Sequence, residues 1–414
     1  MNLIESIEIT MFLKRKHTYF NIKRKNMQKL KILFLGAGYA NISALKSIRA
    51  EYFDKAEITL VSKHNYHYHT VLLHTIAAWG ESVKNVKFPL EKILDSKIKF
   101  LQDNVVELRE DSVMLEQNGE LKGYDYIVSG LGFSSESFGI KGISDFTLNI
   151  HSYESALKIH EKIKQNILRY KTSSDENDLK IIVCGGGLTG VEFASELALS
   201  AKEIAESNAI DSKKIKIYII EAMPSILPMY SKALVAKAYK RLESLGVEVK
   251  NNAKILECFE NGIKIAESSG ENTLNANNII WTAGVKGNEI IAKSNFKNGR
   301  SKVEVGANMK NIENLYPKYF FIGDNSCLKD AQGAFYPPTA QLSVQEGVAL
   351  AGNIMNLIDG KNIESSFEFI PKASFCSLGR GYAIGYIYNF HFSGKIASFI
   401  KHFIESRWVK TILK

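Results

Sequence analysis

The sequence has few cysteines and no long apolar run. Its four cysteines, among 414 residues, form neither a CxxC motif nor a paired spacing that would suit a metal site. Scattered thiols of this kind are typical of a reducing compartment such as the cytosol. No stretch of about 18 apolar residues occurs, so we expect no transmembrane helix. Low-complexity tracts are absent, and the only repeated pattern is a glycine-rich one.

The first residues lack the order of a signal peptide, because acidic residues precede a weak apolar stretch and basic residues follow it directly. We interpret residues 1–27 as a basic, disordered N-terminal arm. Met27 stands just ahead of the first predicted strand, and the native start stays open among Met1, Met11 and Met27.

The net charge of +9 is concentrated at the two ends of the chain. Residues 1–31 hold eight Lys or Arg against two Glu, and residues 380–414 hold six against one. The ends therefore carry +6 and +5, and the middle carries −2. A basic excess confined to the ends argues against a nucleic-acid-binding face and favours contact with an anionic surface such as a membrane.

Two glycine-rich turns dominate the pattern. GAGYAN at residues 36–41 and GGGLTG at residues 185–190 each follow an apolar, strand-like run. In a strand-turn-helix unit such glycines allow a tight turn and let the backbone approach a pyrophosphate, which lies on the N-terminus of the following helix. Two copies predict two dinucleotides, a flavin and a nicotinamide held face to face.

The order of the segments predicts an α/β fold with two Rossmann-like dinucleotide-binding domains, one inserted in the other. A chain of this length exceeds what one core normally holds. We expect a discontinuous FAD-binding domain at 28–149 and 301–360, an NADH-binding domain at 150–300, and a membrane-association region at 361–414. The polar segment KTSSDENDL at 171–179 is interpreted as a solvated linker loop.

Single residues near the two turns refine this reading. Glu221 ends the strand KIKIYII, where a carboxylate accepts hydrogen bonds from ribose hydroxyls and repels a 2′-phosphate, which predicts NADH over NADPH. The alternative is an exposed acid at a strand end. In the first copy Asn41 replaces the third glycine, and Ser62 stands where a ribose-binding acid is expected, with Lys63 beside it near the phosphates.

The last 21 residues predict an amphipathic helix over 394–414. Its apolar side chains fall on one face and most basic ones elsewhere: Ile396, Phe399, Ile400, Phe403, Ile404 and Trp408 against Lys395, Lys401, Arg407 and Lys410. Such a helix either packs on the protein core or lies on a membrane surface. The aromatic content and the nearly acid-free polar face favour the membrane.

Taken together, a set of motifs resembles the type II NADH dehydrogenases, from about Lys31 to the C-terminus. The motifs are GAGYA, NYHYHTVLLH, YDYIVSGLGF, GGGLTGVEF, IIEAMPSILP, WTAGVKGN, FIGD, YPPTAQLSVQEG and SLGRGYAIG. The resemblance implies a two-dinucleotide flavoprotein fold with a C-terminal membrane-binding region and noncovalent FAD. It also implies electron transfer from NADH to membrane quinone without proton pumping, at the cytoplasmic face of the cell membrane, by a peripheral protein. Monomer and homodimer both stay open.

The resemblance also assigns residues. Asp324 is expected to bond the FAD ribityl or pyrophosphate region, and Ala340 and Gln341 to lie beside the isoalloxazine. Gln341 and Gln345, four residues apart on one helical face, resemble the pair that lines the quinone site; helix capping is their alternative. Glu192 is expected near nicotinamide and flavin, with a first-turn acid that complements the helix dipole as its alternative.

The motifs and the resemblance together give a full set of expected site residues. Catalytic residues are Glu192, Gln341 and Gln345. Residues for FAD are Gly36, Gly38, Tyr39, Ala40, Asn41, Ser62, Lys63, Val105, Leu131, Gly132, Asp324, Ala340 and Gln341. Residues for NADH are Gly185, Gly187, Leu188, Thr189, Gly190, Glu192, Glu221 and Gly284. No metal is expected, because His67, His69 and His74 have no acid or cysteine cluster near them in sequence and favour packing near the flavin.

Three other activities compete with this reading. Sulfide:quinone oxidoreductases share the architecture but use a redox cysteine pair near the flavin, and here only Cys376 is a plausible late cysteine. Thiol-disulfide reductases carry their pair after the first glycine turn, whereas no cysteine precedes Cys184. A membrane-associated, NADH-binding flavoprotein without quinone turnover is the third.

Overall fold

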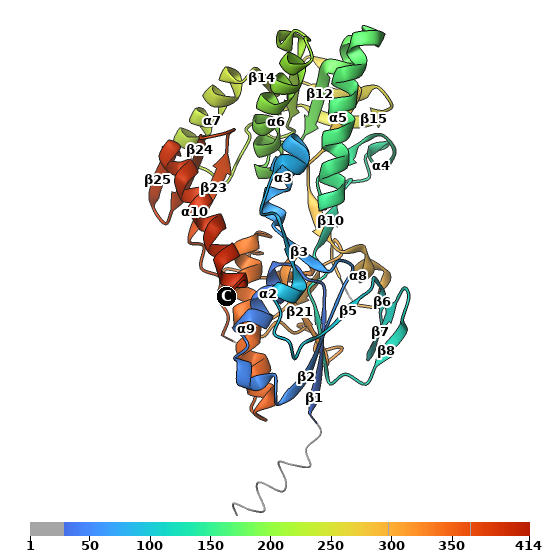
Figure 1. The fold of residues 1–414 in the computed structure, drawn as a ribbon, viewed down its shortest axis with the longest axis vertical. Helices are drawn as coiled ribbons and strands as arrows, with labels where there is room; N and C mark the ends of the chain where they lie inside the picture. The colour runs from blue at the N-terminus through green and yellow to red at the C-terminus, as the bar shows by residue number, and fades with distance from the viewer. Residues whose placement is uncertain (1–28, 297, 365) are drawn as a thin grey trace, which may run out of the picture.

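Two five-stranded parallel sheets organise the molecule and lie toward its opposite ends (Figure 1). The computed structural model describes residues 29–296, 298–364 and 366–414. The expected N-terminal arm, with all three candidate start residues, lies outside the described residues.

The first sheet contains the strand that precedes the first glycine turn. All its neighbouring strands pair in parallel. Its order is β21 (Tyr319–Phe321), β9 (Tyr126–Ser129), β1 (Leu30–Leu35), β2 (Ala56–Ser62) and β5 (Lys99–Gln102). A strand from late in the chain thus completes a sheet that begins at Leu30.

The second sheet repeats this plan around the second glycine turn. It is also fully parallel, which explains its near-continuous apolar strands. Its order is β11 (Leu148–Asn149), β18 (Asn278–Trp281), β12 (Lys180–Cys184), β13 (Lys216–Ile220) and β14 (Val247–Lys250). In each sheet the strand ahead of the glycine turn lies in the centre, with its successor on one side.

Helices cover one face of each sheet and antiparallel strands cover the other. The first sheet packs on α2 (Tyr39–Ser47) and α9 (Ala340–Ile358), and the second on α5 (Tyr153–Ser173), α6 (Leu188–Ser207) and α7 (Lys232–Ser244). The opposite face of the first sheet carries β6 (Val105–Leu108), β7 (Ser112–Leu115) and β8 (Gly119–Lys122). The opposite face of the second sheet carries β15 (Lys254–Phe259), β16 (Gly262–Glu267) and β17 (Gly270–Asn275). The predicted long helix after GGG is α6.

Short elements join the two halves. The helix α3 (Leu73–Trp79) leaves the first half and packs between α5 and α6 of the second (Figure 1). The remaining short elements are α4 (Ile143–Phe146), α8 (Glu289–Lys293), and the strand pairs β3 (Tyr66–Tyr68) with β4 (Lys87–Pro89), β10 (Phe133–Ser135) with β19 (Val285–Gly287), and β20 (Val303–Val305) with β22 (Ser326–Leu328).

The C-terminal part is a three-stranded antiparallel sheet followed by one helix. The strands are β23 (Ala373–Ser377), β24 (Ala383–Ile387) and β25 (Phe390–Gly394), and the helix is α10 (Lys395–Ile412). From β25 the helix runs back to the first half, where Ile412 is buried with the core of the first sheet (Figure 1). Within the described ranges, no helix combines the length and apolar character needed to span a bilayer.

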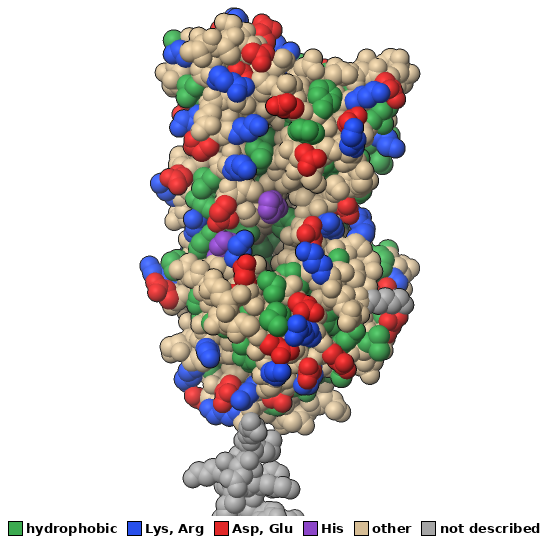
Figure 2. Space-filling model, turned by 90° about the vertical axis from the view of Figure 1, so that its right-hand side faces the viewer, with side chains coloured by type: hydrophobic (Ala, Val, Ile, Leu, Met, Phe, Trp, Pro, Cys, Tyr) green, Lys and Arg blue, Asp and Glu red, His purple; other side chains and the backbone are tan. Residues whose placement is uncertain are grey.

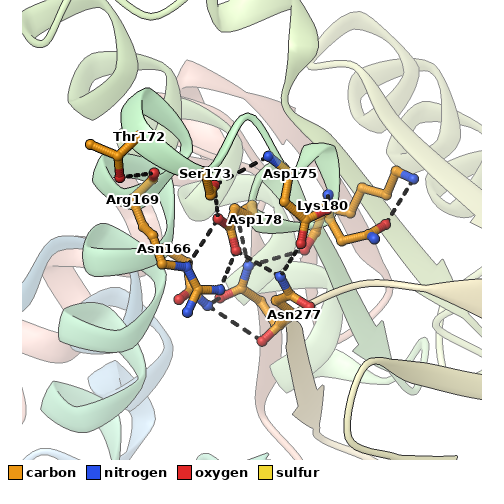
Figure 3. Close-up of polar contacts among 10 residues, drawn as sticks. Asn166, Arg169, Thr172, Ser173, Asp175, Asp178, Lys180 and Asn277 are labelled. Atoms are coloured by element: carbon orange, nitrogen blue, oxygen red, sulfur yellow. Dashed lines mark hydrogen bonds and ion pairs between the residues drawn. The ribbon is translucent and has the colours of Figure 1, made fainter.

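The segment 171–179 is only in part the solvated loop that its composition predicts: residues 171–174 and Glu176 are exposed, but its two ends are structured. Helix α5 continues to Ser173, and Asp178 is buried with its side chain only 1% exposed. Its carboxylate accepts hydrogen bonds from Arg169, Asn277 Nδ2 (2.6 Å) and Ser173 Oγ (2.8 Å) (Figure 3). The polar residues of this segment thus bond one another and fasten α5 to the starts of β12 and β18.

Candidate active site

The first glycine turn leaves the N-terminus of α2 open. Gly36 has a φ of +92°, and a Cβ there would lie 2.5 Å from the carbonyl oxygen of Gly130, so only glycine fits. Gly38 is the exposed N-cap of α2, and no side chain caps the helix. The free N–H groups of its first turn therefore form an anion-binding end at the carboxyl edge of the first sheet.

Asn41 is accommodated in the first turn by a glycine on the next strand. Its Nδ2 donates to the carbonyl oxygens of Leu35 and Gly36, each at 2.7 Å, and the residue is fully buried. A Cβ on Gly130 would lie 2.6 Å from that same Nδ2. The space that the third glycine normally provides is thus provided by Gly130 instead.

Asp324 offers a carboxylate close to this turn. It lies in the 3₁₀ turn η7 (Gly323–Asn325), directly after β21. The next residue, Asn325, fixes the turn by accepting from the Gly132 N–H (2.9 Å) and donating to Ser129 Oγ (2.7 Å). No residue that the structure describes donates a hydrogen bond to the Asp324 side chain. Burial raises its pKa, and the nearby Lys302 opposes that rise.

The other expected FAD residues divide into two groups. Ser62 and Lys63 lie at the carboxyl end of β2, one buried and one exposed, and Leu131 and Gly132 are half-buried after β9. The side chains of Tyr39 and Val105 instead point into packed regions: Tyr39 contacts His67, His69 and Trp408, and Val105 belongs to the core beneath the first sheet. The apolar Val105 side chain therefore has no polar group to offer a cofactor, whereas the buried Tyr39 hydroxyl and Asn41 Oδ1 have no hydrogen-bond partner among the described residues.

The second glycine turn likewise leaves the N-terminus of its helix, α6, without a side-chain cap. Gly187 is the N-cap of α6 without a side-chain cap, and the first turn of α6, which contains Leu188 and Thr189, holds no acid. A Cβ on Gly190 would overlap the carbonyl oxygen of Gly185, so helix and turn pack here as the pattern requires.

Glu221 is bonded to the turn rather than simply exposed at a strand end. Its Oε2 accepts from the Gly186 N–H at 2.6 Å, and its Oε1 accepts from the Met223 N–H at 2.7 Å. The side chain is half-buried. These two bonds hold a carboxylate beside the anion-binding end of α6, with Gly284 exposed after the neighbouring strand β18.

Glu192 is buried in a cluster of charged side chains and is not the first-turn acid of the alternative reading. It lies on the second turn of α6 and is 7% exposed. Its Oε1 lies 3.4 Å from Lys401 Nζ and accepts from the Ser377 N–H at 2.8 Å, while its Oε2 lies 3.5 Å from His74 Nδ1. Burial lowers the pKa of His74, so this histidine is a neutral partner at neutral pH.

Gln341 and Gln345 bond a neighbouring segment and do not cap their helix. Thr339 is the N-cap of α9, with its hydroxyl accepting from Leu342 N–H. Gln345 exchanges two bonds with the backbone of Ile370, at 2.9 and 3.2 Å. Gln341 accepts from the Lys372 N–H at 2.7 Å and donates to the Ala373 carbonyl at 3.3 Å. The two amides therefore fasten the segment 370–373 along α9.

Known proteins resemble this chain over most of its length. Residues 30–347 match the family model described as pyridine nucleotide-disulphide oxidoreductase. The type II NADH:quinone oxidoreductase of Staphylococcus aureus (strain MSSA476) is 35% identical over 386 residues, which cover 92% of this chain and 95% of the relative. The chain belongs to the type II NADH:quinone oxidoreductase family.

Solved structures show the same fold. NDH2 from Plasmodium falciparum, in complex with NADH, superposes with a TM-score of 0.82 at 20% identity, covering 94% of this chain and 95% of that one. The sulfide:quinone oxidoreductase of Aquifex aeolicus reaches 0.74 at 17% identity, covering 93% and 91%. The fold is therefore common to the NADH and the sulfide enzymes and does not separate them.

The cysteines count against the sulfide-type chemistry. Cys184 lies in β12 and Cys376 in β23, and both are free and buried. Burial raises the pKa of both thiols well above the ordinary value. A thiol works as a nucleophile through its thiolate, so neither is suited to redox chemistry in this state.

Two ionisable side chains with little exposure are not predicted by the sequence pattern. Lys401, expected on the polar outer face of the last helix, points inward to Glu192 and Glu405. Glu346 is 1% exposed and bonds the turn that carries Asp324. Spacing could have revealed both. Glu346 is four residues from each of two buried leucines, and Lys401 belongs to an inward stripe with Ala397, Glu405, Trp408 and Ile412.

The last helix turns much of its apolar face to solvent. Its largest exposed fractions are 74% for Phe399, 65% for Ile396 and 54% for Phe403. Trp408, expected on this face, instead packs inward, with its ring nitrogen 3.2 Å from His67 Nε2. The helix is therefore held by a stripe that includes Lys401, Trp408 and Ile412, while Phe399 and Phe403 are left uncovered.

Proposed function

We propose that the chain oxidises NADH and reduces a membrane quinone, without pumping protons. The overall reaction converts NADH, a proton and quinone to NAD⁺ and quinol. The observation that carries the proposal is the pair of open helix ends, α2 and α6, at equivalent edges of two sheets with the same plan. FAD, when bound, supplies the two-electron chemistry between the substrates.

The residues around Gly38 fit FAD. The open end of α2 suits a pyrophosphate, and the unpartnered Asp324 carboxylate suits hydroxyl groups of the ribityl chain. Ala340, at the first position of α9, would lie beside the isoalloxazine, with the hydroxyl of Ser62 near the adenosine ribose. The chain's part in the reaction is to bind and orient this group, since no described cysteine pair shares the chemistry.

The residues around Gly187 fit NADH. The end of α6 would hold its pyrophosphate, and Glu221 would accept hydrogen bonds from both hydroxyls of the adenosine ribose. A 2′-phosphate there would meet the Glu221 carboxylate, which two backbone N–H groups already hold in place. We therefore assign the chain to NADH rather than NADPH.

We place the quinone at the Gln341 and Gln345 end of α9. The two amides already bond the backbone of the segment 370–373. They would therefore influence quinone binding partly by holding this segment in position. Glu192, on the NADH helix α6, accepts from the Ser377 N–H at the end of β23 and so connects this helix with the strand that follows the segment 370–373. Its carboxylate is suited to hold or accept a proton there.

We propose that the uncovered face of α10 rests on the cytoplasmic surface of the cell membrane. Phe390, 72% exposed just before the helix, extends the apolar surface of Phe399 and Phe403. Lys395, Arg407 and Lys410 are exposed on the same helix and suit anionic headgroups. In contrast, the face on the side of α5 and β6–β8 intersperses acidic and basic side chains (Figure 2).

The domain boundaries that we propose follow the two sheets. Residues 28–149 and 301–360 would bind FAD, residues 150–300 NADH, and residues 361–414 the membrane. At the first boundary, β11 (Leu148–Asn149) already pairs with β18 of the second sheet. Association into a homodimer is compatible with this division.

The test is anaerobic. NADH added to the purified protein should bleach the flavin absorbance, and menaquinone should restore it. Sulfide in place of NADH serves as the control and should leave the absorbance unchanged. Bleaching by sulfide, or reduction by NADH without reoxidation by quinone, would contradict the proposed function.

A further inference from the structure

Glu346 is a buried carboxyl group beneath the candidate flavin site. It lies on α9 and is 1% exposed. Its Oε2 accepts from the Gly323 N–H at 2.6 Å, and Gly323 opens the turn that presents Asp324. Gly323 has a φ of +70°, and a Cβ there would lie 3.3 Å from that of Ala40 in α2. The bond therefore fastens the Asp324 turn between the two helices of the first sheet.

The hydrogen bonds around Glu346 come only from neutral groups. Ser326 Oγ donates to the carbonyl oxygen of Gly323 at 2.9 Å and, over the longer distance of 3.3 Å, to Glu346 Oε1. A hydroxyl has one hydrogen, so Ser326 shares it between the two acceptors. Among the residues that the structure describes, no basic side chain forms an ion pair with Glu346, which is 1% exposed. A carboxylate here would have only the Gly323 N–H and a shared hydroxyl to stabilise its charge, which favours the neutral acid.

The charges around Glu346 also favour its neutral form. The charged groups that act on it are the acid Asp324 and the cation Lys302, beside β20. Helix α2 meets α9 here through neutral residues, with Ser43 Oγ donating to the Val344 carbonyl at 2.8 Å. Burial first, and then Asp324, raise the pKa of Glu346 to about 8, against the lowering effect of its bonds and of Lys302.

We propose that Glu346 is a positioning residue for the flavin that works as a neutral acid: it holds the Gly323–Ser326 segment, and loss of its proton releases FAD. The inference rests on the proposed placement of FAD beside Asp324. An ionised Glu346 would place a second negative charge next to Asp324 and close to the pyrophosphate of a bound cofactor.

FAD release from the holoenzyme tests this. Release on dilution is followed by the rise in flavin fluorescence between about pH 6 and pH 9.5. The Kd of the wild-type protein should rise above pH 8 by up to about tenfold per pH unit, as expected when one proton is lost with the cofactor. In Glu346→Gln the amide reproduces both contacts of the neutral acid. This variant should retain FAD at neutral pH as well as the wild type does, and its Kd should stay flat to pH 9.5.

Matched variants separate the effect of the Glu346 charge on FAD binding from the effect of its side-chain packing. Glu346→Leu removes both contacts and should weaken FAD binding at every pH, whereas Glu243→Gln, on the exposed face of α7, should behave as wild type. Circular dichroism checks that each variant is folded. If folded Glu346→Gln loses FAD at neutral pH, or keeps the wild-type pH dependence, the inference is wrong while the proposed function stands. A wild-type protein that binds no FAD would overturn both.

Discussion

Lys401 of the last helix reaches Glu192 of the NADH helix, with Nζ 3.4 Å from Oε1. The same ammonium group lies 2.6 Å from Glu405 Oε1. Burial alone would lower the pKa of Lys401, but the two carboxylates raise it above the ordinary value, so the group stays charged. The C-terminal helix is therefore ion-paired directly to the centre of the candidate active site.

Lys401→Met should destabilise the protein, because it leaves Glu192 and Glu405 without their cation. Breaking a buried pair on one side costs about 3 kcal/mol or more. The free energy of unfolding in urea measures the loss. Lys410→Met, on the exposed side of the same helix, is the matched control and should change it by less than about 0.5 kcal/mol. If both variants lowered the free energy of unfolding equally, the buried ion pair would contribute no more to stability than an exposed lysine does.

Glu221→Arg should shift nucleotide preference. The carboxylate is lost, and a guanidinium can pair with a 2′-phosphate. The ratio of kcat/KM for NADH to that for NADPH should fall by about 10-fold to 100-fold. Glu221 also accepts bonds from Gly186 and Met223, so some loss with both nucleotides is expected. An unchanged ratio would remove this acid from the ribose site.

Replacing Phe399 and Phe403 together by Glu should release the protein from membranes. Each buried phenylalanine contributes about 1.5–3 kcal/mol. Affinity for anionic lipid vesicles should therefore fall at least about 100-fold. Cosedimentation measures it, with Ile312→Glu, an exposed apolar residue elsewhere, as the control. NADH-to-ferricyanide activity should persist, and a parallel loss of that activity would point to a folding role.

Gln345→Leu should act mainly on quinone. It removes two bonds to Ile370, each contributing about 1 kcal/mol, and frees the segment 370–373. The KM for quinone should rise by about tenfold or less, while the KM for NADH stays unchanged. Gln332→Leu, in an exposed turn, is the control. Loss of FAD from the purified variant would instead assign Gln345 to cofactor retention.

Asp178 should give the protein an acid-sensitive contribution to stability. Burial raises its pKa, but the bonds from Arg169, Asn277 and Ser173 outweigh this and lower it below 3.8. A lowered folded-state pKa means that the stabilisation is present above 3.8 and is lost as pH falls through the folded value. Asp178→Asn should cost about 1–2 kcal/mol at pH 7. The difference from wild type should shrink below pH 3.8, and a constant difference would contradict the assignment.

The sequence predicted the regular parts of the fold well. Both glycine turns, the long helix α6 and the late strand β21 follow patterns that depend on neighbours in the chain, and all are present. The polar segment at 171–179 is exposed over much of its length as predicted, but the buried Asp178 was missed because its hydrogen bonds to Arg169 and Asn277 cannot be read from composition. Lys401 was misplaced because its charge, rather than the helical stripe that it shares with Ala397 and Ile412, decided its assignment, and its partner Glu192 is distant in sequence.

The contact between Asn41 and Gly130 couples substitutions at these two positions. Glycine at position 41 would restore the common form of the first turn but remove the side-chain donor of the Gly36 carbonyl, while the Leu35 carbonyl would keep only the Gly130 N–H, and a gap would remain beside Gly130. Any side chain at position 130 would meet Asn41 at 2.6 Å. Each substitution alone should destabilise the first turn. A change at one of the two positions therefore requires a compensating change at the other.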